Sequence, residues 1–171
     1  MPRIIEIAPY DPSWPLLFLR EAGRIRAALG ERALGIEHAG STSVPGLAAK
    51  PVIDILLTVA DSANENAYLP KLEDKGYRLL IREPAWHDHR MLKGPDTDVN
   101  LHVFSLNCPE IGRVLLFRDW LRSNPADRER YAQRKLALAA NEWAGVQDYA
   151  DAKTAVVEEI LGRAEAALQS S

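Results

Sequence analysis

HAGSTSVPG (residues 38–46) and PVIDILLTV (residues 51–59) are the stretches that decide the fold of this chain. The second is an almost unbroken run of aliphatic and β-branched residues, which predicts a central strand covered on both faces of its sheet. The first begins at the end of a short predicted strand over 34–38 and continues as a loop of small residues. The sequence thus places a small-residue loop shortly before a buried strand.

The elements on either side complete a mixed pattern of helices and strands. A helix is predicted from Trp14 to a stop at Gly30, and a helical segment over 61–75 is interrupted, or started late, by Pro70. Further predicted elements are strands over 77–82, 89–93 and 99–105, and helices from 109, from 125 and over 148–168. This order predicts an α/β (α+β) fold, a mixed β-sheet flanked by helices with a helical C-terminal third.

Composition narrows the classes of protein that remain. The 171 residues are expected to form one domain over 1–171. With 21 Lys and Arg against 24 Asp and Glu, the net charge of −3 provides no global positive field, so a nucleic-acid partner is not expected. The single Cys108 excludes a disulfide framework and a Cys-rich zinc site. No stretch has the pattern of a signal peptide or a membrane span, so we expect a cytoplasmic protein with no membrane partner.

The loop around Gly40 is the first candidate site. Gly40 lets a ligand approach the main chain closely, and the backbone N–H groups and hydroxyls of Ser41, Thr42 and Ser43 can cradle phosphate oxygens. A plain Ser/Thr-rich turn explains the same residues. The loop is not a P-loop, because it lacks the Gly-Lys-Ser/Thr ending and Lys50 lies ten residues beyond Gly40.

Acidic and histidine side chains on two predicted strands form the second candidate site. Asp54 is the one charge inside an aliphatic strand, where a carboxylate is costly unless it is paired or bound to a metal. A structural Asp hydrogen-bonded to a neighbouring loop is the alternative. Alternation places Asp98, Asn100 and His102 on one face of the strand over 99–105, as in a ligand site or a half-exposed strand. The pair His87-x-His89 is expected to be a solvated loop rather than a metal site.

Two Tyr–Lys pairs lie on the predicted C-terminal helices. Tyr131 with Lys135, and Tyr149 with Lys153, are four residues apart, so each pair shares a helix face. Such pairs can bind a phosphate or a base, although packing of the side chains over apolar neighbours is the favoured interpretation of any one pair. Arg118 is likewise explained by pairing with a local carboxylate.

These residues together carry a resemblance to the GrpB family. The matching motifs are His38-x-Gly40-Ser41-Thr42-Ser43-Val44-Pro45-Gly46-Leu47-x-x-Lys50-Pro51-x-Ile53-Asp54-Ile55, Tyr10-Asp11-Pro12-x-Trp14, Leu101-His102-Val103 and Phe117-Arg118-Asp119-x-Leu121-Arg122. That family is similar to the nucleotidyltransferase superfamily, which has a mixed sheet flanked by helices and a Gly-Ser loop that binds phosphate. Some members are fused to dephospho-CoA kinase, which indicates a nucleotide or CoA context.

The resemblance implies a set of site residues. The expected catalytic residues are Ser41, Asp54 and His102, and the expected metal ligands are Asp54, Asp98 and His102. The expected ligand- or phosphate-binding residues are Gly40, Ser41, Thr42, Ser43, Lys50, Arg90, Lys93, Arg118, Tyr131, Lys135, Tyr149 and Lys153. A divalent metal, Mg²⁺ or Mn²⁺ with Zn²⁺ less favoured, is implied as the cofactor.

One departure from the superfamily pattern bears on activity. Two carboxylates two residues apart would hold a metal between them, but Val52 and Leu56 occupy the positions on either side of Asp54. The expected function is therefore binding of a nucleotide or phosphorylated small molecule, with transfer of a nucleotidyl group to a small acceptor as its extension. A catalytically degenerate module that binds a nucleotide or other anion is the alternative. An interaction module that acts through the helical third ranks last, and the oligomeric state is left open.

Overall fold

In the computed structural model, one mixed sheet runs through the part of the chain that the structure describes, residues 6–140 and 146–170, with side chains of the second range described from Lys153 on. Its strands are β1 (Gly35–Ala39), β2 (Ile53–Val59), β3 (Arg78–Glu83), β4 (His89–Lys93) and β5 (Val99–Ser105). They lie in the order β1-β2-β5-β4-β3, with β2 and β5 parallel and every other pair antiparallel. This confirms the mixed sheet predicted from the sequence.

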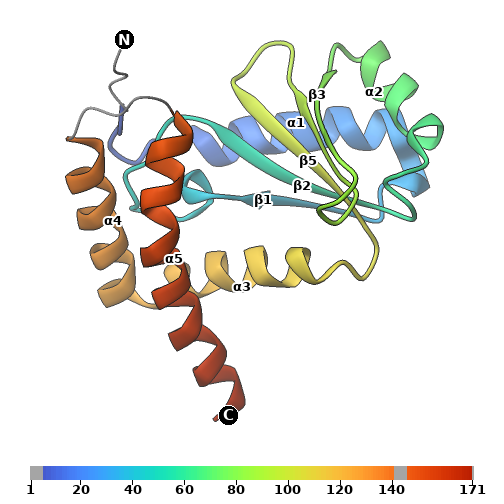
Figure 1. Ribbon diagram of the computed structural model, residues 1–171. Coiled ribbons are helices and arrows are strands. Elements are labelled where there is room, and N and C mark those ends of the chain that lie inside the picture. The colour runs from blue at the N-terminus through green and yellow to red at the C-terminus, as the bar shows by residue number, and fades with distance from the viewer. Residues whose placement is uncertain (1–5, 141–145, 171) are drawn as a thin grey trace.

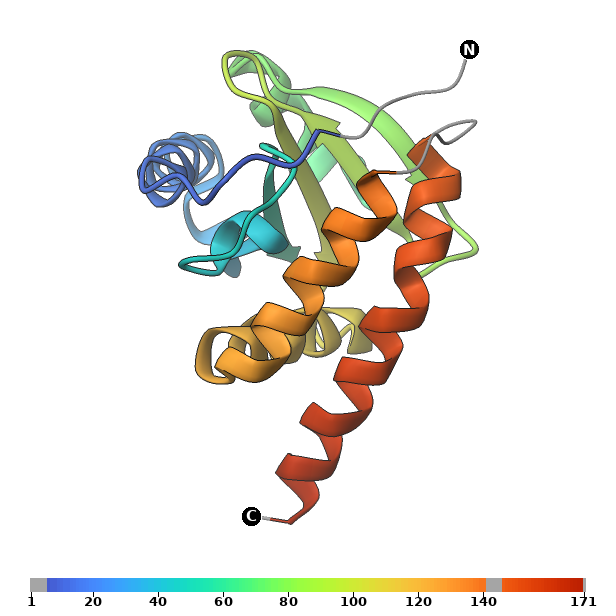
Figure 2. The same cartoon turned by 90° about the vertical axis from the view of Figure 1, so that its left-hand side faces the viewer.

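Helices cover both faces of the sheet. They are α1 (Trp14–Leu29), α2 (Leu69–Asp74), α3 (Pro109–Ser123), α4 (Pro125–Ala139) and α5 (Val146–Gln169), with short 3₁₀ turns η1 (Gly30–Arg32), η2 (Ser41–Ser43) and η3 (Glu65–Ala67). Figure 1 shows α4 and α5 side by side at one end of the sheet. Figure 2 shows α1 on the opposite side of the sheet from α3, α4 and α5. The helical C-terminal third is therefore one packed layer.

Proline sets where several helices begin. Pro15, Pro70, Pro109 and Pro125 each lie in the first turn of a helix, where the missing N–H has no intrahelical partner to lose. The helical segment expected over 61–75 is shorter for this reason, because α2 begins only beside Pro70 and η3 precedes it. Of the two alternatives for that segment, the late start is the correct one.

The two faces of the sheet carry different chemistry. On the face toward α1 and α2, alternate residues of β2 and β5, such as Ile55, Leu57 and Leu101, form an apolar core. On the other face, Leu56 and Phe104 pack against α3, and polar residues occupy the positions between and beyond them. This second face leaves room for a site between the sheet and the helical layer.

A core substitution tests the assignment of the apolar face. Leu57→Ala should lower the free energy of unfolding by about 2–5 kcal/mol, because it removes a fully buried side chain and leaves a cavity. Leu19→Ala on the exposed side of α1 is the control, with an expected change within about 0.5 kcal/mol. Urea denaturation measures both, and equal effects of the two substitutions would contradict the assigned face.

Candidate functional site

A pocket with a volume of about 250 Å³ lies where the loop after β1, strand β2 and helices α3, α4 and α5 meet. Its charged lining residues are the cations Lys50, Arg113, Arg118, Lys135 and Lys153 and the carboxylate Asp54. The other lining residues include Gly40, Ser41, Asn100 and Tyr131, together with apolar residues such as Val44 and Phe117. A chain with a net charge of −3 thus contains a pocket in which cations predominate.

Gly40 lies directly beside the Asp54 carboxylate in this site. Ala39 is paired with Asp54 across β1 and β2, so the next residue passes over the Asp54 carboxylate. Gly40 has a φ of +70°, and a Cβ added there would lie 2.4 Å from Asp54 Oδ2. Both the left-handed backbone and the space available therefore require glycine at this position.

Of the loop hydroxyls, only that of Ser41 lines the pocket. Thr42 is buried and donates to the carbonyl of Val52 at 3.1 Å. Ser43 is also buried and donates to the carbonyl of Gly40 at 2.5 Å. These two hydroxyls hold the loop in shape, so the structure does not bring Thr42 and Ser43, expected to bind phosphate, to the pocket.

His38 faces the interior of the loop rather than the pocket. Its Nε2 lies 3.0 Å from Thr42 Oγ1, and its ring stacks on Phe18 at a centroid separation of 4.9 Å. Because the Thr42 hydroxyl already donates to a carbonyl, His38 Nε2 carries the hydrogen and donates. Burial, followed by the charge of Arg122, lowers the pKa of His38 to about 4, so the ring is neutral.

Two arginines of α3 fasten the loop from outside. Arg118 donates to the carbonyl of His38 at 3.1 Å and to Glu37 at 2.7 Å. Arg122 donates to the carbonyl of Ser43 at 3.0 Å. Arg118 therefore lines the pocket, as expected of a ligand-binding residue, and also makes the carboxylate pairs that its structural interpretation predicts.

A row of polar side chains crosses the sheet beside the pocket. Asp54 and Asn100 are paired in register on parallel strands β2 and β5, and both line the pocket. His102 Nε2 lies 3.2 Å from Asp54 Oδ1. The row continues through His89, whose Nε2 is 2.9 Å from His102 Nδ1, and ends at Glu83, whose Oε1 is 2.7 Å from His89 Nδ1. His89 is thus a buried strand residue, and the solvated-loop interpretation is wrong for it, whereas His87 is exposed.

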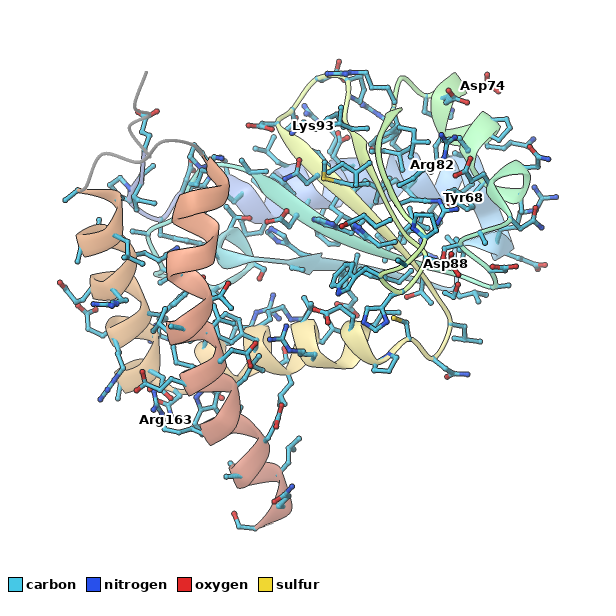
Figure 3. The ribbon with its side chains drawn as sticks, viewed as in Figure 1. Tyr68, Asp74, Arg82, Asp88, Lys93 and Arg163 are labelled. Atoms are coloured by element: carbon cyan, nitrogen blue, oxygen red, sulfur yellow. The ribbon has the colours of Figure 1, made fainter. Side chains whose placement is uncertain are left out.

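Lys93 and Asp98 form a separate pair near the end of the sheet. Lys93 Nζ lies 2.5 Å from Asp98 Oδ1 and 2.7 Å from Asn100 Oδ1. Figure 3 shows Lys93 at the opposite end of β4 from Asp88. Neither Lys93 nor Asp98 lines the pocket, so the structure does not bring them to Asp54.

Arg90 lies on the opposite face of the sheet from Asp54. Its Nε lies 2.8 Å from Glu65 Oε2, and the same carboxylate binds Arg82. Figure 3 places Tyr68 and Arg82 together at that end of the molecule. Arg90 is expected from the sequence to bind phosphate, but the structure gives it a structural ion pair away from the pocket.

The donor set beside the loop does not fit a metal held by the protein alone. Among the described residues, no group of three or more His, Cys, Asp or Glu side chains is arranged to hold an ion. In the part of the pocket lining that the structure describes, Asp54 is the one carboxylate, whereas Mg²⁺ and Mn²⁺ prefer several oxygen ligands. Of the expected ligands, the structure joins Asp54 with His102 and leaves Asp98 apart.

Lys135 is the most deeply buried cation of the pocket. Only 2% of it is exposed, its Nζ donates to the carbonyl of Ala48 at 2.8 Å, and it lies 4.9 Å from the ring centre of Tyr131. Burial, with a smaller effect of Lys153, lowers the pKa of Lys135 to about 7. Burial also raises the pKa of Tyr131 to about 12. The structure thus brings this Tyr–Lys pair and Lys153 to the pocket, while the side chain of Tyr149 lies outside the described residues.

Three participants are not identified as site residues by the sequence. Arg113 lines the pocket from α3. The signal that could have found it is the four-residue interval that separates it from Phe117 and separates Phe117 from Leu121. Glu83 and His89 join the polar row because they pair directly across β3 and β4. Their pairing depends on the length of the turn between the strands, which the sequence indicates only weakly.

Within the described residues, no helix combines the length and apolar character that crossing a membrane requires.

Nearly the whole chain is similar in sequence and in structure to known proteins. The family model described as GrpB protein matches residues 4–163. A UPF0157 protein of Halalkalibacterium halodurans is 62% identical over 95% of this chain and 83% of its own length, and one of Streptomyces coelicolor is 44% identical over 95% and 86%. The crystal structure of conserved protein GrpB from Enterococcus faecalis superposes with a TM-score of 0.82 at 33% identity, covering 93% of this chain and 96% of that chain.

A longer relative contains a similar region. A dephospho-CoA kinase of Mycolicibacterium paratuberculosis is 32% identical over 74% of this chain, and the match spans 38% of that kinase.

The contact between Gly40 and Asp54 gives a test by substitution. Gly46→Ala should lower the free energy of unfolding by about 1–2 kcal/mol, because Gly46 has a φ of +83° and open space around it. Gly40→Ala should cost more, because the same backbone strain is joined by a collision with Asp54. Adding Asp54→Ala to Gly40→Ala should recover part of that excess in a double-mutant cycle measured by urea denaturation. Strictly additive effects would contradict the contact.

Buried neutral His38 predicts a pH dependence of stability. Its pKa of about 4 in the folded protein lies below the value of about 6.5 in an unfolded chain, so the unfolded state binds more protons as the pH falls. The stabilisation is present above pH 6.5 and is lost between about pH 6.5 and 4, by up to about 3 kcal/mol. In urea denaturation across this range, His38→Gln should flatten the profile, and His87→Gln at an exposed position should leave it unchanged. A wild-type-like slope in His38→Gln would contradict this assignment.

Proposed function

The chain belongs to the GrpB family, and from this premise we propose that its pocket binds a phosphorylated small molecule of the nucleotide class. The observation that carries the proposal is the charge of the pocket, because five cationic side chains and one carboxylate of the described residues line the same cavity. Anions are attracted to such a cavity more strongly than to an exposed surface, because its walls exclude water.

Several of these cations already form ion pairs with carboxylates of the protein, so they have less charge to offer a ligand. Arg118 is paired with Glu37 and Asp119, and Arg113 with Glu110 and Glu158. Lys135 donates only to a neutral carbonyl among its described contacts. We therefore assign Lys135 as the principal charge for a phosphate, with Lys50 at the exposed rim and Lys153 from α5 as contributors.

The loop supplies the neutral part of the recognition. At Gly40 no side chain keeps a ligand away from the backbone, and Ser41 provides a hydroxyl on the same wall of the pocket. A volume of about 250 Å³ is slightly below the range of drug-sized sites, roughly 300–1,000 Å³. The pocket therefore suits a small phosphorylated molecule or the phosphate-bearing part of a larger nucleotide.

Transfer of a nucleotidyl group to a small acceptor is the finer proposal. Asp54 lies against the loop and is hydrogen-bonded to His102, so this pair could take a proton from an acceptor hydroxyl. The similar region in a dephospho-CoA kinase supports a nucleotide context, because CoA itself contains an adenine nucleotide. The lack of a second carboxylate beside Asp54 favours the alternative, a module that binds without turnover.

The divalent metal implied by the resemblance stays a prediction. Because Asp54 is the one carboxylate that the described residues contribute to the lining, an ion held by them would have to obtain most of its oxygen ligands from the phosphates and water. The side-chain cations can balance phosphate charge directly. The steps proposed here therefore depend only on protein groups.

A ligand panel tests the binding proposal. ATP, GTP, CTP, UTP, AMP and inorganic pyrophosphate are added to the full chain in EDTA, in Mg²⁺ and in Mn²⁺. The change in melting temperature is measured for each ligand, and titration calorimetry then measures the Kd of those that raise it. A ligand at 100 times its Kd should stabilise the protein by about 2.7 kcal/mol. Lys135→Met should weaken binding at least tenfold, whereas Lys71→Met on the exposed side of α2 should leave it unchanged.

The Asp54→Asn variant separates the two modes of binding. If side-chain cations alone hold the phosphate, removal of the nearby negative charge should strengthen binding in EDTA. If Asp54 holds an ion, the same substitution should abolish a metal-dependent gain in affinity. Release of pyrophosphate in the presence of an acceptor screen, lost in Asp54→Asn, would support transfer. The absence of any shift with every ligand would contradict the proposed function.

A further inference from the structure

The outer strand β3 of the sheet has a self-complementary edge, and we propose that two copies of this chain associate through it as an antiparallel dimer. β3 stands last in the strand order, so β4 pairs with one of its two sides. In the ranges that the structure describes, no further backbone segment bonds to residues 78–82. Unpaired N–H and C=O groups along the side of a strand are a template for another strand.

The opposite edge of the sheet is partly occupied by α3. The outer strand there is β1, and Arg118 of α3 donates to the carbonyl of His38 at 3.1 Å and to Glu37 at 2.7 Å. On β3, by contrast, five of the six residues are exposed, and the remaining one, Leu79, is partly buried. The β3 edge is therefore the one that is open to a second strand.

Apolar side chains lie in the middle of this exposed strand. Leu80 is 53% exposed and Ile81 is 37% exposed. Leu79 and Ile81 pair with adjacent residues of β4, so Leu80 between them is the extra residue of a β-bulge. Association of two copies along β3 would remove part of this apolar surface from water, which favours the dimer.

Opposite charges lie at the two ends of β3. Arg78 is exposed at one end, and the side chain of Glu83, which is 46% exposed, is at the other. In an antiparallel pair of two such strands, each Arg78 can lie opposite the partner's Glu83. Opposite charges directly across a strand pair are stabilising and like charges are destabilising. The two ends of β3 are thus complementary to each other.

The bulge places these two charges on the same face of the sheet. Residues five apart in a regular strand point to opposite faces, whereas residues that oppose each other in a strand pair share a face. On β4, Arg78 is paired with Lys93. Glu83 is paired with His89, an even four residues before Lys93, so Arg78 and Glu83 share one face. Without the extra residue, the two ends of β3 could not meet in a symmetric pair.

The same count applies to the positions next to the ends. Leu79 and Arg82 pair with residues that are two apart on β4, so both lie on the other face. A two-fold axis at the bulge therefore sets Arg78 against the partner's Glu83 with their faces matched. It also sets Leu79 against the partner's Arg82, again with matched faces. A slip of one residue would instead oppose Arg78 and the partner's Arg82, which have like charges and lie on different faces.

This pattern favours a second copy over an unrelated strand. Bulges and charged side chains ordinarily protect an edge strand from pairing. In β3 they admit one register, because the charge at each end needs its opposite at the matching position of the incoming strand. An antiparallel copy of β3 meets that need at both ends at once, as a two-fold interface requires.

The dimer is expected to be transient and to leave the pockets open. A strand of six residues is about 20 Å long, so the contact is at the small end of interface sizes, below about 1,200 Å². Of the described residues that line the pocket, none lies on β3 or β4. Figure 1 shows α4 and α5, which contribute to the pocket, apart from β3. Association is therefore independent of the proposed ligand binding.

Analytical ultracentrifugation of the full chain tests the dimer. From about 1 µM to about 1 mM protein, the mass should rise from that of one chain toward that of two. Leu80→Lys should raise the dimer Kd at least about tenfold, because it brings two like charges together at the centre of the edge. Leu16→Lys, at an exposed position of α1, is the matched control and should leave the Kd unchanged. A wild type that stays monomeric, or a Leu80→Lys variant that dimerises as well as wild type, would overturn the proposal.

A charge exchange tests the register. Arg78→Glu and Glu83→Arg each set like charges against each other at both ends of the dimer, so each variant alone should be monomeric where wild type dimerises. An equal mixture of the two should associate again, because both ends then join opposite charges. Two folded variants that fail to associate in the mixture would contradict the antiparallel register. The Leu80→Lys result decides the proposal even where loss of the contact with His89 unfolds Glu83→Arg.

Discussion

The close passage of the Gly40 main chain over the Asp54 carboxylate is the constraint on which the rest of the site depends. It is possible only because β1 and β2 pair in the register that sets Ala39 opposite Asp54. Glycine accepts the left-handed backbone and leaves the space that any side chain would fill. The hydroxyls of Thr42 and Ser43 donate hydrogen bonds to backbone carbonyls and so hold the loop in shape. Arg118 and Arg122 of α3 donate to two further carbonyls of this segment. Ser41 is left as the loop hydroxyl that faces the pocket.

The helical layer supplies most of the cations that line the pocket beside this loop. Helices α3, α4 and α5 bring cations to the pocket that Asp54 also lines, although the whole chain is slightly acidic. Lys135 is held in an environment that lowers its pKa toward neutrality, because burial disfavours its charged form. An anion bound beside it would restore that charge. In the proposed function, recognition of an anion would therefore depend on the same burial that lowers the pKa of Lys135.

Much of the fold could be predicted from hydrophobic patterning and proline. The run over 51–59 became β2, and the proline positions fixed where α1, α3 and α4 begin. The site was only partly predictable. Lys135 and Lys153 were expected and do line the pocket, whereas Arg90 and Lys93 were expected there and do not. Alternation along β4 separates Arg90 from its neighbours on the opposite face, and the approach of Asp98 decides the partner of Lys93.

The sequence by itself determined the family, the order of helices and strands, and the need for glycine and small residues before a buried strand that carries one carboxylate. These properties depend on local backbone preferences and on the period of apolar residues. Only the tertiary structure decided which polar side chains meet. Glu83, His89, His102 and Asp54 come from four strands, and their contacts arise from strand order and register. Hydrogen bonds act over about 3 Å, so a chain of them exists only where the packing of the whole sheet has fixed each partner in place.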